Sequence, residues 1–156
     1  MTRLFGLTVT AVAVAATAFA ASHANPALEG AVKARGAQMT MISYHTGLLG
    51  DMAKGDVPYD AAMATAAAEN LAAAAAMKRA TLWIEGSEQG AVEGSRAKAE
   101  IWSAPAGFEE KAVALEPAAA TMVTAAGTDL EALRAAMGGI GGSCKGCHEA
   151  YRGPRN

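Results

Sequence analysis

The chain has 156 residues, a formal net charge of −2 at pH 7, and 18% charged against 52% hydrophobic residues. It has no run of basic residues and few aromatic side chains on which bases could stack, which excludes a nucleic-acid-binding surface. Alanine is abundant and no stretch alternates apolar and polar residues with period two, so the sequence predicts a single all-α domain.

Residues 1–24 have the pattern of a signal peptide. Arg3 precedes an apolar run over residues 4–21, and Ser22-His23-Ala24 supplies the small residues that a signal peptidase reads. The run is about long enough to cross a bilayer, so a retained membrane anchor is the alternative. The Ala and Thr content of the run and the cleavage site favour removal after Ala24. The mature domain would then comprise residues 25–156, with no membrane anchor.

The first two predicted helices are marked by the residues at their ends. Asn25 is a good N-cap and Pro26 suits the first helical position, so a helix is predicted from there to about residue 53. Gly55 ends this helix, and residues 56–58 form a turn. A second helix is predicted over about residues 59–81, with polyalanine in its middle.

Two more helices follow a Gly- and Ser-rich loop at residues 85–95. The third is predicted over about residues 97–126, with a bend at 104–107 where Pro105 removes an amide hydrogen bond. Thr128-Asp129-Leu130-Glu131 is a capping box that begins a fourth helix, which ends near Arg152. Four helices joined by short connections predict an antiparallel four-helix bundle, a fold that binds cofactors between facing helices.

One face of the first helix is predicted to point into the bundle, because its residues recur at alternating spacings of four and three. Arg35 is unusual on such a face, since an inward guanidinium usually has a carboxylate to meet. Met39 lies one turn further along this face. Met41 and His45 fall outside it, and His45 is predicted to be a surface or interface histidine. The predicted face comprises Leu28, Val32, Arg35, Met39, Ile42, Thr46, Leu49 and Ala53.

The segment Cys144-Lys145-Gly146-Cys147-His148 has the C-x-x-C-H spacing of a c-type haem attachment site. Each thiol can add to one haem vinyl group, and the adjacent imidazole can bind the iron from the proximal side. These are the only two cysteines of the chain, so a four-ligand zinc site has no second pair. A thioredoxin-like redox pair belongs to a βαβ context and has no need of the histidine. The motif therefore predicts one haem c, covalently attached through Cys144 and Cys147, with His148 as axial ligand.

Together with this motif, several short segments resemble the class II cytochromes c, the family that includes cytochrome c′ and its low-spin relatives. The resemblance covers residues 25–152 and implies a periplasmic monohaem cytochrome. One departure is Gly36, because the family often has Gln there. The matching segments are Arg35-x-x-x-Met39, Gly55-Asp56-Val57-Pro58-Tyr59-Asp60, Glu100-Ile101-Trp102 with Phe108 after it, and Cys144 to His148 followed by Tyr151-Arg152.

The resemblance also implies a role for each matching residue. The two cysteines would form the thioethers, and His148 would be the proximal iron ligand. Arg152 would lie along the proximal face, where the family uses this cation to tune the histidine. Arg35 would approach the haem propionates, and Met39 would face the distal side of the iron.

Met39 lies at the position that separates two functional types of this family. In the low-spin relatives a first-helix Met binds the iron and the protein transfers electrons. We expect this type: a periplasmic electron carrier ligated by His148 and Met39, which meets periplasmic redox proteins and is not an enzyme. The alternative is a five-coordinate high-spin cytochrome c′ that binds NO or CO. Because members often pair through their first two helices, a homodimer is also expected.

Overall fold

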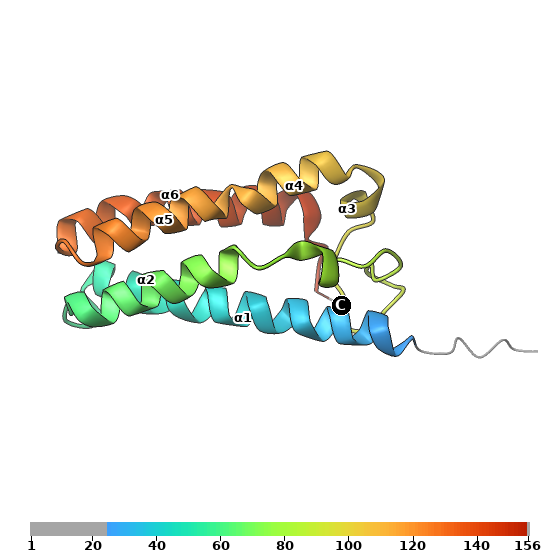
Figure 1. Cartoon of the computed structure of the whole chain (residues 1–156), viewed down its shortest axis with the longest axis horizontal. Coiled ribbons are helices and arrows are strands. Elements are labelled where there is room, and N and C mark those ends of the chain that lie inside the picture. The colour runs from blue at the N-terminus through green and yellow to red at the C-terminus, as the bar shows by residue number, and fades with distance from the viewer. Residues whose placement is uncertain (1–24, 156) are drawn as a thin grey trace, which may run out of the picture.

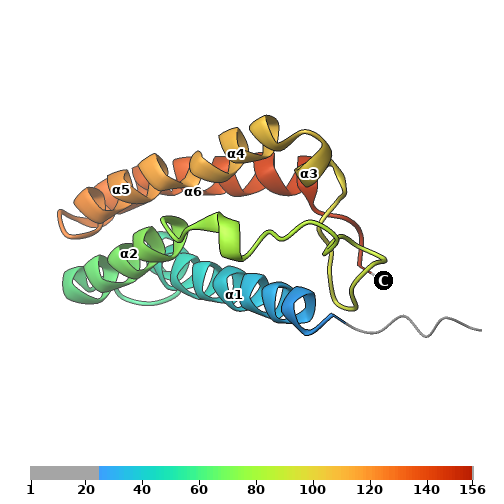
Figure 2. The same cartoon turned by 45° about the vertical axis from the view of Figure 1, so that its right-hand side comes forward.

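A computed structural model describes residues 25–155, and the predicted signal peptide lies outside this range. The described chain is helical, and α1 and α2 lie side by side as one pair while α5 and α6 form another (Figures 1 and 2). Contacts of α2 with α5 and of α1 with α6 join the pairs, which confirms the predicted four-helix bundle. The elements are α1 (Pro26–Lys54), α2 (Ala61–Ala75), the 3-10 helix η1 (Arg79–Thr81), α3 (Glu100–Ser103), α4 (Pro105–Val113), α5 (Leu115–Ala126) and α6 (Leu130–Tyr151).

The ends of three helices are fixed by capping side chains. Asn25 caps α1, Asp60 caps α2 and Asp129 caps α6, each accepting a hydrogen bond from a backbone amide of the first turn. The α6 cap lies one residue beyond the start of the predicted capping box. Gly55 ends α1 with a φ of 85°, a left-handed conformation that favours glycine. Between residues 25 and 155, no helix is long and apolar enough to cross a membrane.

The predicted second and third helices are both shorter than expected. After Ala75 the chain leaves the α2 axis, and extended Lys78 (ψ 122°) leads into η1 and brings Leu82 into the interior. The predicted third helix is divided into α3, α4 and α5. Pro105 accounts for the first division, and Pro117 accounts for the second because it has no amide to bond the carbonyl of Val113.

Two clusters of apolar side chains form the core. The main cluster lies between the helix pairs, where the small alanines of α2 allow close packing around fully buried Leu49, Leu71 and Met122. The second, which we call the aromatic cluster, lies at the end of the bundle where α1 begins and α6 ends (Figure 1). It comprises Ala97, Ile101 and Phe108, with Trp83, Trp102, Ala112, Cys147 and Tyr151 packed against them.

The predicted inner face of α1 is wrong by part of a turn. Met39 is 39% exposed, whereas His45, predicted to lie at the surface, is only 6% exposed. Polar Gln38 is on the buried face, where its Nε2 donates to the carbonyl of Ala74 on α2. An apolar stripe could not reveal this arrangement because three of the buried positions, Arg35, Gln38 and His45, are polar or charged. The buried α1 residues are Ala31, Arg35, Gln38, Ile42, His45, Leu49, Gly50 and Met52.

Candidate haem site

The two cysteines lie one turn apart on α6 as half-buried free thiols. Cys144 packs against the main core, and Cys147 packs against the aromatic cluster. Burial raises the pKa of both thiols. The two sulfur-bearing side chains therefore border the interior at one end of the bundle, as covalent attachment of a cofactor within the bundle requires.

His148 is half-buried at the next position of α6. Burial lowers the pKa of its imidazole, and the positive charges of Arg152 and Arg96 lower it further. The neutral imidazole is thus favoured, and this is the form that binds a metal. With Lys145, these arginines line a shallow groove beside His148, so the structure places Arg152 near the predicted proximal ligand.

Arg35 is buried, and its guanidinium bonds to the connection between α2 and α3. Nη1 donates to the Leu82 carbonyl (3.1 Å) and to Ser87 Oγ (2.6 Å), while Nη2 donates to the Ser87 carbonyl (2.9 Å) and to Ser95 Oγ (3.2 Å). Burial lowers the pKa of Arg35. None of the ion pairs within residues 25–155 includes it, so this buried cation has no carboxylate partner. A haem propionate would supply the missing negative charge, which fits the cofactor that the cysteine motif predicts.

The aromatic cluster surrounds Cys147 and links it to Arg35. The centroids of the Trp83 and Phe108 rings are 4.8 Å apart, and those of Phe108 and Tyr151 are 5.4 Å apart. The indole nitrogen of Trp102 donates to the Trp83 carbonyl at 3.1 Å. Both tryptophans are therefore packing residues around the motif, and Trp83 also contacts the Arg35 guanidinium.

Sequence reasoning missed the residues that hold Arg35 and the chain end. Ser87 and Ser95 are buried acceptors for its guanidinium, but small hydroxyls in a Gly- and Ser-rich loop carry no signal of that role. Arg96 also went unnoticed. Its Nε and Nη2 donate to the Gly153 carbonyl at 3.0 and 2.7 Å, which holds the chain end next to α6.

Comparison with known proteins now decides the family. A family model described as Cytochrome C′ matches residues 30–152. The chain belongs to the cytochrome c′ family. This assignment confirms the predicted resemblance to class II cytochromes c, and the cytochrome c′ match spans α1 to α6.

Individual cytochromes of this kind are similar over nearly their whole length. Cytochrome c-554 of Cereibacter sphaeroides is 44% identical over 125 residues, which is 80% of this chain and 94% of the relative. A solved cytochrome c′ from Rhodobacter sphaeroides has a TM-score of 0.79 at 38% identity, covering 82% of this chain and 98% of that one. A nitric oxide complex of a mutant cytochrome c′ from Alcaligenes xylosoxidans has a TM-score of 0.71 at 39% identity, covering 81% and 97%. A carbon monoxide-bound variant of the same protein is equally similar.

Membership of the cytochrome c′ family confirms the predicted cofactor. The protein binds one covalently attached haem c, and its only cysteines, Cys144 and Cys147, are the attachment residues.

The prediction of a low-spin electron carrier ligated by His148 and Met39 is wrong. The family is that of cytochrome c′, and solved relatives hold nitric oxide or carbon monoxide. In the structure, Met39 lies off the buried face of α1. A Met four residues after Arg35 is therefore insufficient evidence for a bond to iron.

Proposed function

We propose that this protein is a periplasmic, five-coordinate high-spin cytochrome c′ that binds nitric oxide and carbon monoxide reversibly and is not an enzyme. The observation that carries the proposal is the likeness to the nitric oxide and carbon monoxide complexes, each 39% identical to this chain over 81% of its length. The signal-peptide pattern of residues 1–24 supports the periplasmic location.

Four of the predicted site residues have a task in this function, which is to hold the haem. When bound, the haem supplies an iron with one open coordination position for a diatomic gas. Cys144 and Cys147 would hold the group covalently on α6, and the neutral imidazole of His148 would bind the iron. The buried Arg35 guanidinium would neutralise a propionate. Met39, which lies off the buried face of α1, would form no bond to iron.

The test is the visible spectrum of the purified holoprotein, oxidised and reduced, before and after addition of carbon monoxide. We expect a broad high-spin spectrum that shifts as soon as the gas is added to the ferrous protein. A sharp pair of α and β bands on reduction, with no response to the gas, would disprove the five-coordinate assignment. Recovery of the holoprotein by osmotic shock would test its location separately.

We also propose that the protein forms a homodimer through α1 and α2. Large apolar side chains are exposed on both helices: Met41 is 49% exposed, Tyr44 58% and Met63 52%. Association that covers such side chains is favoured by the hydrophobic effect. Sedimentation of the purified holoprotein tests this second proposal.

A further inference from the structure

The connection between α2 and α3, residues 76–99, has little helical structure. Its only helix is the three-residue η1. Nevertheless it supplies Leu82, Trp83, Ser87 and Ser95, the groups that surround the Arg35 guanidinium. The position of Arg35 therefore depends on whatever holds this connection in place.

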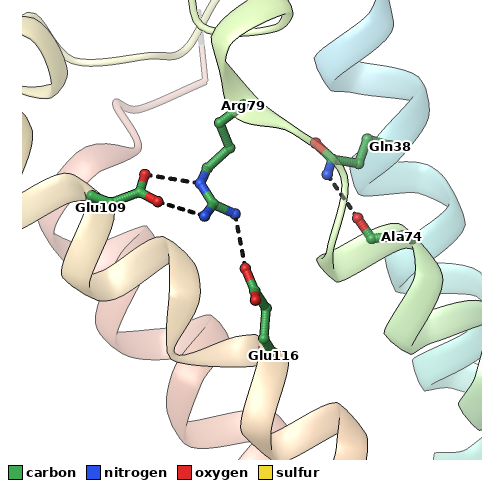
Figure 3. A network of polar contacts seen from close by, with 5 residues as sticks. All are labelled: Gln38, Ala74, Arg79, Glu109 and Glu116. Carbon is green, nitrogen blue, oxygen red and sulfur yellow. Dashed lines mark hydrogen bonds and ion pairs between the residues drawn. The ribbon is translucent and has the colours of Figure 1, made fainter.

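Arg79, the first residue of η1, binds the connection to both α4 and α5 (Figure 3). Its Nε and Nη2 donate to the two carboxylate oxygens of Glu109 on α4, at 2.9 and 2.5 Å. Its Nη1 donates to Glu116 Oε1 on α5 at 3.2 Å. The Arg79 side chain is only 19% exposed. A bidentate arginine–carboxylate pair with a second carboxylate is the geometry in which surface ion pairs contribute most to stability.

This ion-pair network is directly coupled to Leu82 and Trp83. The backbone amides of both residues donate to the Arg79 carbonyl at 2.9 Å, so a shift of Arg79 moves both. Trp83 packs on Phe108, which directly precedes Glu109 on α4. Arg79 and Trp83 thus attach residues 79–83 to α4, through Glu109 and Phe108. The same short segment contacts Arg35 through the Leu82 carbonyl and the Trp83 ring.

We propose that Arg79 is a positioning residue for the gas site. Through Glu109 and Glu116 it fixes residues 79–87 against α4 and α5, which sets the position of Arg35 and Trp83 and, through them, of the haem propionate that Arg35 would meet. This inference rests on the proposed function of the protein as a gas-binding cytochrome c′.

The test uses the holoprotein and three variants: Arg79→Gln, Glu109→Gln and the double variant. The association rate of carbon monoxide with ferrous iron should change by about threefold or more in each single variant. The double variant should show no further change beyond that of Arg79→Gln, because this substitution already removes the bonds to both Glu109 and Glu116. Arg79→Lys keeps the positive charge but cannot form the bidentate pair, so its carbon monoxide association rate should be intermediate. The matched control is Lys54→Gln, which removes ion pairs to Asp51 and Asp56 at the other end of α1.

A second readout separates positioning from a purely structural role. The ferric electron paramagnetic resonance signal reports the iron environment directly, and it should differ from wild type in Arg79→Gln but not in Lys54→Gln. If the thermal midpoint falls while both the gas rate and this signal stay unchanged, Arg79 only stabilises the fold and the proposal is wrong. If the wild type binds no carbon monoxide, the proposed function is wrong. The role of Arg79 in positioning Arg35 and Trp83 is then tested by the resonance signal alone, and an unchanged signal in Arg79→Gln would refute it.

Discussion

The guanidinium carbon of Arg35 lies 4.8 Å from the centroid of the Trp83 ring. This contact joins α1 to the connection between α2 and α3, and it places a cation against the negative face of an aromatic ring. Because Arg35 also donates to hydroxyl and carbonyl oxygens, its charge meets several weak partners in place of one carboxylate. A buried charge thus holds the part of the bundle around the aromatic cluster, whereas the main core between the helix pairs is packed mostly with aliphatic side chains.

Replacing Arg35 by Gln should lower the free energy of unfolding by about 1–3 kcal/mol, because buried acceptors at Leu82 and Ser87 lose their donor. Urea unfolding of the holoprotein, followed by far-ultraviolet circular dichroism, measures this change. Lys33→Gln is the matched control, since Lys33 is an exposed cation on the same helix. The control should change the stability by no more than about 0.5 kcal/mol. Equal stability of the two variants would contradict the structural role of the Arg35 contacts.

Replacing Met39 by Leu should leave the high-spin spectrum in place, because this side chain is not an iron ligand in the proposed five-coordinate site. Carbon monoxide should still shift the ferrous spectrum at once. The measurement is the absorption spectrum of the reduced variant with and without the gas. Met52→Leu, a swap of similar size at a buried α1 position, controls for general effects of losing a thioether. A wild-type low-spin spectrum that becomes high-spin only in Met39→Leu would reinstate the iron–sulfur bond.

The pair of Arg79 and Glu109 should make stability depend on pH in the acid range. Arg79 lowers the pKa of the Glu109 carboxyl below its ordinary 4.5, so the folded state is favoured above that pH. This contribution is lost as the pH falls through the lower, folded-state value. Because Glu109 is largely exposed, the difference between wild type and Glu109→Gln should be under about 1 kcal/mol at neutral pH.

Urea unfolding at a series of pH values measures that difference, which should shrink as the pH falls below 4.5 and through the lower, folded-state pKa. The control is Glu69→Gln, which removes an exposed α2 carboxylate that belongs to no ion pair of the described chain. A difference for Glu109→Gln that persists unchanged in acid would show that the ion pair is not its source.

Placing a charge on the outer side of α1 should separate a homodimer. Tyr44→Asp introduces a carboxylate at a 58% exposed aromatic position, and burying it against a second copy would cost its hydration. Sedimentation velocity should show the mass of a dimer for wild type and that of a monomer for the variant. Thr121→Asp, on exposed α5 surface, should remain dimeric. A monomeric wild type would refute the proposed association.

The parts of the molecule that follow from local chemistry were predictable from the sequence. The Asn25 cap, the left-handed Gly55 and the C-x-x-C-H motif each depend on a few adjacent residues, and the structure has all three where expected. The bundle itself could be predicted from the residues that begin and end its helices. The division of the predicted third helix at Ala114 also has a local cause, Pro117, and the prediction missed it because it considered only Pro105.

The parts that depend on distant partners were not predictable. The inner face of α1 was misassigned because Gln38 and His45 are polar residues at buried positions. The acceptors of Arg35 lie 52 and 60 residues away, at Ser87 and Ser95, and no periodic pattern connects them to α1. Such contacts arise only when the connection folds back over the bundle.

Two hydrogen bonds at the far end of the bundle have a mechanical consequence. The Tyr59 hydroxyl donates to the Ala126 carbonyl at 2.8 Å, and Arg134 Nε donates to the Ala53 carbonyl at 2.6 Å. Each bond crosses from the α1–α2 pair to the α5–α6 pair, at the end of the bundle where α5 ends and α6 begins (Figure 1). Beyond α2, the ion pairs of Arg79 with Glu109 and Glu116 join the same two halves of the bundle a second time. The two pairs are therefore fastened at more than one level, so that loss of one fastening would leave them joined at the other.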